Sequence, residues 1–146
     1  GVLVFIPELA QTVADNAARH GLGERFTGAR HVGFGFADVL AAFDDPAPLI
    51  ERFQVAARGL IEQGAEVIIP GEAPLNVMLA REGVAEIDGV PVVDSLAAWV
   101  KQAETLVDLR RLCGIRPCRK GYFTGLPDPD RVEEILAFYG QEIPRS

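Results

Sequence analysis

Three carboxylates could carry chemistry, because each follows a short apolar run typical of a buried strand and comes just before a helix pattern. They are Glu8 after residues 2–6, Glu72 after residues 66–70 and Asp94 after residues 90–93. Ligands of open α/β sheets bind at the carboxyl ends of the strands, where a carboxyl group can transfer a proton or orient a substrate. Helix capping is favoured for Glu8 and Asp94, because acids in a first turn complement the helix dipole. Glu72 lies in a loop before its helix, so a functional role has about equal weight.

The sequence gives less support to a hydrolase triad, a dinucleotide-binding loop or a metal site. Ser95 has no G-x-S-x-G context and no suitably placed histidine, which disfavours a hydrolase triad. The run GFGFAD at residues 33–38 has only two glycines of a dinucleotide fingerprint, and its acid would repel a pyrophosphate. A metal held by the three carboxylates is a minor alternative. His31 lies in an apolar run and is expected to be a satisfied core residue.

The two cysteines, Cys113 and Cys118, are expected to be reduced thiols of a cytoplasmic protein. They are so close in the sequence that a disulfide between them would not connect distant parts of a large fold. A disulfide across the short turn remains a minor alternative. The two histidines lack ligand spacing to them, which disfavours zinc.

Composition limits the class of partner. The chain has 146 residues, of which 49% are hydrophobic and 24% charged, and its formal net charge is −7. We therefore expect a globular domain whose partner is a small molecule rather than nucleic acid or an anionic membrane, since both of those need a basic face. A local basic pocket for a small acid remains open.

The elements that would position the carboxylates alternate between strand and helix. Strand patterns at 2–6, 26–32, 66–70 and 90–93 alternate with helix patterns at 9–20, 36–43, 48–63, 75–81 and 95–113, and a last helix follows Asp128 and Pro129. This order predicts an α/β fold in three layers, with a mostly parallel sheet flanked by helices. We expect a lobe over residues 1–114 and an extension over 115–146 that packs on this lobe or on a missing one.

The apolar run begins directly after Gly1. A strand buried on both faces needs neighbours and covering layers, so we expect sequence upstream of Gly1. An exposed strand edge there would also favour a homo-oligomer.

Two segments resemble the aspartate/glutamate/hydantoin racemase superfamily. Residues 64–72 (GAEVIIPGE) are similar to its G-A-D-x-I-h-x-G-C-T segment, and residues 89–94 (GVPVVD) to its G-h-P-V-h-D segment, where h is apolar. A long helix follows in both cases, and the opening GVLV, a helix and Gly21-Leu22 are similar to the start of the family's second lobe. The resemblance extends to about Gly114.

The resemblance implies a Rossmann-like lobe of a two-lobed protein with its active site in the cleft between the lobes. Two cysteines, one from each lobe, would transfer protons on opposite faces of the substrate without a cofactor. This chain departs from that pattern. We expect the lobe with the first cysteine to be missing from it, the second cysteine position matches Glu72 and the following threonine matches Ala73. The two-thiol mechanism therefore cannot be carried over.

The leading hypothesis is an isomerase of the racemase type that acts on a small chiral acid, an amino acid or a hydantoin. Glu72 would be the base or would orient the substrate, and the cleft would be lined by Pro7, Glu8, Gly71, Ala73, Asp94 and Ser95. A small-molecule binder without catalysis is one alternative. A lyase, a decarboxylase or a cis–trans isomerase on the same scaffold is another, and fold alone does not choose among them.

Overall fold

The computed structural model describes residues 1–116, 120 and 127–140, a range that leaves out Cys118. The chain divides into two compact units, Gly1–Glu104 and Thr105–Ser146. This division falls inside the long helix α5 (Ser95–Cys113). The predicted domain boundary after Gly114 stays a prediction.

The first unit contains a parallel sheet whose strands are β1 (Val2–Val4), β2 (Ala29–His31) and β3 (Ile69–Pro70), in the order β2-β1-β3. Leu3 of β1 lies opposite Arg30 on one side and Pro70 on the other. A parallel bridge between Ile68 and Val92 continues the pairing beyond β3. The most apolar run of the chain therefore forms the central strand, as a strand buried on both faces requires.

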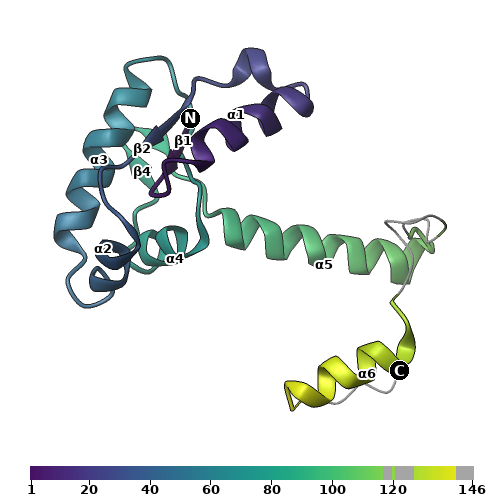
Figure 1. The fold of residues 1–146 in the computed structure, drawn as a ribbon. Helices are drawn as coiled ribbons and strands as arrows, with labels where there is room; N and C mark the ends of the chain where they lie inside the picture. Colours follow the sequence, from purple (N-terminus) through teal and green to yellow (C-terminus); the bar gives the residue numbers. More distant parts are fainter. Residues whose placement is uncertain (117–119, 121–126, 141–146) are drawn as a thin grey trace. The chain divides into compact units, whose positions relative to one another are not determined.

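Helices cover both faces of this sheet. Helices α1 (Leu9–Arg19) and α3 (Ala47–Ile61) both contact β1 and β2, and Figure 1 shows these strands between the two helices. Right-handed crossovers that run in opposite directions place their helices on opposite faces of a parallel sheet. The predicted three-layer α/β fold is confirmed.

The main core lies between the sheet, α3 and α4 (Ala73–Arg81). Every residue of the apolar stripe on α3 is buried, namely Leu49, Phe53, Ala56, Ala57 and Leu60. They recur at helical spacing, so one face of α3 meets the buried side chains Leu3 and Phe5 from β1 and its end. Burying each large apolar side chain contributes roughly 1.5–3 kcal/mol. This face of the sheet carries most of the packing.

Residues 86–91 form a hairpin that the sequence only partly predicts. Strands β4 (Glu86–Ile87) and β5 (Val90–Pro91) pair antiparallel across Asp88 and Gly89, which have φ values of 52° and 79°. Two positive φ values define the turn favoured by Asp-Gly, so the predicted tight turn is confirmed. A fully buried strand over residues 90–93 is wrong, because Val90 pairs with Ile87 and only Val92 joins the parallel sheet.

The remaining elements are short or belong to the second unit. The first unit also has a 3-10 turn, η1 (Gly23–Arg25), and a short helix, α2 (Phe36–Ala41). In the second unit α6 (Pro129–Phe138) begins as predicted, with the Asp128 side chain accepting a hydrogen bond from the Asp130 N–H. Within the described residues no helix is long and apolar enough to cross a membrane, and the Cys113 thiol is free and exposed.

Candidate active site at the carboxyl edge of the sheet

The connections of the sheet change direction at β1. From β1 the chain passes through α1 to β2 on one side, and it later returns through α3 to β3 on the other side. Such a reversal leaves a crevice outside the carboxyl ends of the two strands at the switch, which is where open α/β sheets bind ligands. Pro7 and Glu8 follow β1 there, and Gly71 and Glu72 follow β3. The topology therefore brings these two predicted pairs of residues to neighbouring strand ends.

Gly71 allows β3 to lie close to β1. Its N–H donates a 2.8 Å hydrogen bond to the carbonyl oxygen of Leu3. A Cβ at position 71 would lie 2.8 Å from Cγ1 of Val4, closer than real Cβ contacts. The lack of a side chain at Gly71 therefore lets the backbone that carries Glu72 approach the end of β1.

The Glu72 side chain reaches from the end of β3 to the end of β1. Its Oε1 accepts hydrogen bonds from the backbone N–H groups of Phe5 at 3.0 Å and Ile6 at 3.1 Å. Glu72 occupies the N-cap position of α4, yet its side chain makes no capping hydrogen bond. Two consecutive N–H groups that converge on one oxygen form an anion-binding concavity. The carboxyl group thus joins the two strand ends instead of capping its own helix.

Burial of Glu72 changes its protonation. Its second oxygen, Oε2, is buried and has no hydrogen-bond partner among the described residues. Loss of hydration raises the pKa of the Glu72 carboxyl, while the N–H groups of Ile6 and Phe5 and the electrostatic effect of His31 act to lower this pKa. Burial is the largest of these effects, so Glu72 binds its proton more tightly than an ordinary glutamate does.

His31 is the last residue of β2, the strand next to β1. Its Nδ1 accepts from the Gly33 N–H at 3.2 Å, so the proton of the neutral ring is assigned to Nε2, which lies 3.2 Å from the carbonyl oxygen of Phe5. The prediction of a core residue is wrong, because His31 lies on an edge strand and is exposed. Its hydrogen bonding is nevertheless satisfied, and it holds the same Phe5 backbone that Glu72 holds.

The other residues predicted near Glu72 are exposed. Pro7 and Glu8 lie in the turn that leads into α1, and Ala73 is the first residue of α4. Glu8 takes the N-cap position of α1 without a side-chain capping bond. Within the described part of the chain the Glu8 side chain makes no hydrogen bond or ion pair, so the capping role expected for it is not seen.

Asp94 and Ser95 form a different arrangement at the start of α5. Asp94 Oδ1 accepts from Asn76 Nδ2 at 2.8 Å and from the Ala97 N–H at 2.9 Å, which is helix capping as the sequence favours. Ser95 donates to Asn76 Oδ1 from its N–H at 2.8 Å and from its hydroxyl at 2.9 Å. The N–H of Ala97 and the Asn76 amide lower the pKa of the exposed Asp94 carboxyl, which therefore stays ionised.

Asn76 is a residue of this arrangement that the sequence alone does not single out. It lies on α4 one turn after Glu72, it is 2% exposed, and it links α4 to the start of α5. A buried asparagine needs partners for both ends of its amide, and Asp94 and Ser95 supply them. A polar residue between the apolar residues Leu75 and Met78 was the available signal.

Asp94 also lines a cavity. A cavity of about 180 Å³ lies between α4 and the segment after β5, and its polar side chains are Asp94 and Asn76. The rest of its wall is apolar or backbone, from Pro70, Leu79, Ala80, Gly83, Val84, Ala85, Val92 and Val93. A hollow of about 390 Å³ lies on the other side of Asp94, along the start of α5. Among the described residues no group of three or more His, Cys, Asp or Glu side chains is placed to hold a metal ion.

Comparison with known proteins supports one relationship. A hydantoin racemase of Pseudomonas sp. (strain NS671) is 31% identical over 109 residues, which are 74% of this chain and 42% of that protein. The match supports a relationship to the racemases at the level of the family, and the chain spans less than half of that relative's length. No protein-family model matches the chain, and no solved structure matches it.

Proposed function

We propose that this chain is one lobe of a racemase-type isomerase. It would move a proton at the stereocentre of a small chiral acid, an amino acid or a hydantoin, without a cofactor, in a cytoplasmic protein. Glu72 would transfer the proton from this lobe, and a second α/β lobe would close the cleft and supply the opposing group. The similarity to a hydantoin racemase supports the class of reaction, and its partial coverage of that protein is compatible with a second lobe.

One observation carries the role of Glu72. Its carboxyl group lies at the switch point of the sheet, with one oxygen held by two N–H groups and the other buried without a partner among the residues that the structure describes. A general base works best when its pKa lies near the working pH, and burial moves the pKa of Glu72 upward, in that direction. The N–H groups of Phe5 and Ile6 fix the orientation of the carboxyl group at the end of β1.

Solvent isotope exchange tests this proposal. The full-length protein is incubated in D₂O with a panel of chiral acids, amino acids and 5-substituted hydantoins, and loss of the α-proton signal is followed by NMR. We expect exchange with at least one member, and Glu72→Gln should lower its rate about 100-fold or more, the usual contribution of a general base. The absence of exchange across the panel would refute the proposal.

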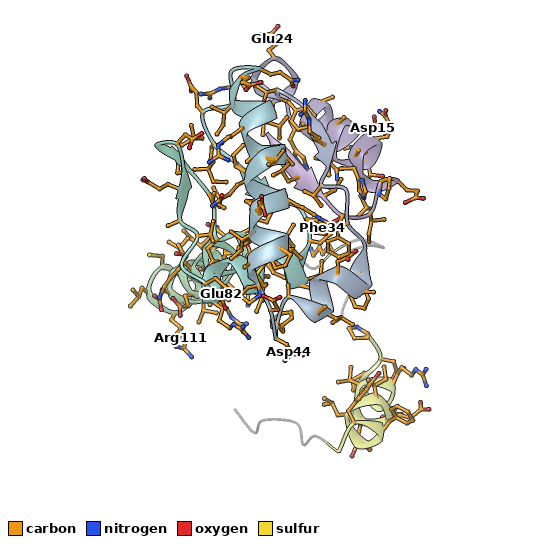
Figure 2. All side chains as sticks on the ribbon, turned by 90° about the vertical axis from the view of Figure 1, so that its left-hand side faces the viewer. Asp15, Glu24, Phe34, Asp44, Glu82 and Arg111 are labelled. Atoms are coloured by element: carbon orange, nitrogen blue, oxygen red, sulfur yellow. The ribbon has the colours of Figure 1, made fainter. Side chains whose placement is uncertain are left out.

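Asp15→Asn is a matched control, because it also converts a carboxyl into an amide. Asp15 lies on α1, where it accepts a 2.8 Å hydrogen bond from the exposed Gln11 side chain, and Figure 2 shows it on the outer side of this helix. This control should keep the exchange rate of the unmodified protein. A similar loss in both variants would mean that Glu72 has no special role.

A second candidate function is a small-molecule binder without catalysis. The observation in its favour is that Glu72 Oε1, Asp94 and Ser95 are all engaged in internal hydrogen bonds. This function predicts that a ligand stabilises the protein against unfolding without isotope exchange. Glu72→Gln would then change the affinity for the ligand, and neither protein would catalyse isotope exchange.

A further inference from the structure

We propose that the free edge of β2 binds an extended acidic segment of another protein, which adds a strand to the sheet. The occupant has carboxylate side chains at alternate positions, and these meet two arginines that lie beside this edge. The inference does not depend on the proposed function, because β2 and the strand that leads to Glu72 lie on opposite sides of β1.

The outer edge of β2 has unused backbone groups. Within the described residues β2 pairs in parallel with β1 and with no other strand. The Gly28 carbonyl oxygen accepts from β1 and the Val32 N–H donates to β1, each at 3.0 Å. Backbone groups along a strand point alternately to its two sides, so the N–H and C=O groups of Ala29 and His31 face away from β1. An open edge of this kind accepts an added strand.

An open groove of about 580 Å³ lies between α3 and the segment from β2 to Gly33. Its wall includes Val55, an apolar residue that is 63% exposed. The charged side chains of the wall are those of Arg30, Arg52 and Glu51. A strand added to β2 would present every second side chain to the face of the sheet that α3 covers. The groove therefore determines which side chains suit that face.

The two arginines of this groove have no acidic partner. Among the described residues neither Arg30 nor Arg52 makes an ion pair, and Glu51 makes none with either. The chain has 21 acidic residues against 14 basic ones, so the absence does not come from a shortage of carboxylates. Two cations against one anion leave the groove positive in an acidic protein. Such a patch favours a partner of negative charge.

The lack of a side chain at Gly59 positions Arg30. A Cβ at position 59 would lie 2.0 Å from Nη1 of Arg30, so the guanidinium group occupies the space of that side chain on α3. Gly59 and Arg52 are about two turns apart on this helix, or roughly 10 Å by the helical rise. Alternate carboxylates of an extended strand lie on one face about 7 Å apart. The long Arg52 side chain can cover the difference, so two such carboxylates reach both arginines.

The same charge disfavours other occupants of the edge. Pairing of all three residues of β2 with a second copy across a two-fold axis places the two copies of Arg30 opposite each other. Like charges in that position are destabilising. An inward-facing charge on an edge strand also disfavours an apolar partner strand. Arg30 therefore selects an acidic strand over a second copy of this chain and over an apolar segment.

Three capped peptides test this proposal with the full-length protein. They are acetyl-Thr-Glu-Thr-Glu-Thr-Glu-Thr-amide and the same peptide with glutamine or lysine in place of glutamate. Binding is followed by NMR of the isotope-labelled protein. We expect the acidic peptide to bind about tenfold more tightly than the glutamine peptide, the factor that two exposed ion pairs provide. The lysine peptide should not bind. The acidic peptide should also protect the amide protons of Ala29 and His31 against exchange, because they gain acceptors.

Variants of the groove separate a local effect from net charge. Arg30→Gln should lower the preference for glutamate over glutamine to about threefold, and adding Arg52→Gln should abolish it. Gly59→Ala keeps both charges and suits the helix, but it displaces the Arg30 guanidinium, so it should weaken binding of the acidic peptide about threefold. Arg19→Gln is the matched control, because it removes an exposed positive charge from the last turn of α1 and should change nothing.

Several outcomes would overturn the inference. They are no binding of the acidic peptide, equal binding of the glutamine peptide, and an unchanged preference in the double arginine variant. Succinate serves as a small dianion that cannot add a strand. If it binds as tightly as the acidic peptide, the groove is an anion site and strand addition is wrong. A dimer that protects the same amides would assign the edge to a second copy. None of these outcomes affects isotope exchange, so this inference and the proposed function fail separately.

Discussion

Glu72 and Asp94 follow neighbouring segments of the same sheet, yet their surroundings act on their carboxyl groups in opposite directions. Asp94 is exposed and receives hydrogen bonds from Ala97 and Asn76, which lower its pKa. Glu72 also receives two hydrogen bonds, but burial outweighs them and raises its pKa. A capping carboxylate stabilises a helix as a permanent anion, whereas a buried one can exchange a proton. The contrast therefore separates a structural carboxylate from a candidate catalytic one.

The largest effect on stability should come from Asn76→Ala. This change removes the amide that donates to Asp94 and accepts from Ser95. Truncation leaves the Ser95 N–H, the Ser95 hydroxyl and the Asp94 carboxyl without the Asn76 amide. Ser95 is half-buried, and donors that lose their acceptor in such a place cost about 1–3 kcal/mol, so we expect a loss of roughly 1–3 kcal/mol in the free energy of unfolding. Urea denaturation measures this loss.

The same variant should also move one pKa and not the other. The pKa of Asp94 should rise toward its usual value, because a donor is lost, while that of Glu72 should stay raised. NMR titration of the two carboxyl groups checks this. Gln11→Ala is the control, since its single exposed hydrogen bond to Asp15 leaves the expected change within about 0.5 kcal/mol. An Asn76→Ala loss no larger than this would mean that the network contributes little.

A smaller effect concerns the dependence of stability on pH, which should have opposite signs at the two sites. The folded-state pKa of Glu72 lies above its usual 4.5, so its stabilising contribution is complete below that pH and is lost as the pH rises through the folded value. The pKa of Asp94 lies below its usual 3.8, so its contribution is present above that pH and is lost as the pH falls through the folded value.

Amide variants test both signs in one experiment. Relative to the unmodified protein, Glu72→Gln should become more stable as the pH rises above 4.5, and Asp94→Asn should become less stable as it rises from below 3.8. Urea unfolding of the three proteins from roughly pH 3 to pH 7 covers both windows. Parallel trends for the two variants would mean that burial does not dominate at Glu72.

Local patterns in the sequence predict much of the fold. The apolar stripe of α3 from Leu49 to Leu60 follows a period of about 3.6 residues, and every member of it is buried. The Asp88-Gly89 turn and the start of α6 at Asp128 and Pro129 depend on the conformations of single residues. Such features form from neighbours in the chain, so the sequence contains their signal directly.

Contacts between distant segments were less predictable. The hydrogen bonds from Phe5 and Ile6 to Glu72 span more than 60 positions, and no local pattern in the sequence predicts them. Position 72 could be chosen because it follows a strand, but its donors could not. The link from Asn76 to Ser95 spans 19 positions and has the same origin. Which strand ends become neighbours is set by the order of the strands, and this order is a property of the whole fold.

The smallest expected effect on stability comes from Ser95→Ala. This variant separates the two contacts of Asn76, whose oxygen accepts from Ser95 and whose nitrogen donates to Asp94. This change removes the hydroxyl bond of 2.9 Å but keeps the 2.8 Å bond from the Ser95 N–H, so Asn76 Oδ1 still has a donor. We expect a loss of about 1 kcal/mol in the free energy of unfolding, the net contribution of one hydrogen bond. The exposed Thr12→Ala change is a control that should have almost no effect.

The pKa of Asp94 should not move in Ser95→Ala, because its donors Asn76 and Ala97 remain in place. If this pKa rises as far as it does in Asn76→Ala, the orientation of the Asn76 amide depends on the Ser95 hydroxyl, and the low pKa of Asp94 is a property of the whole network.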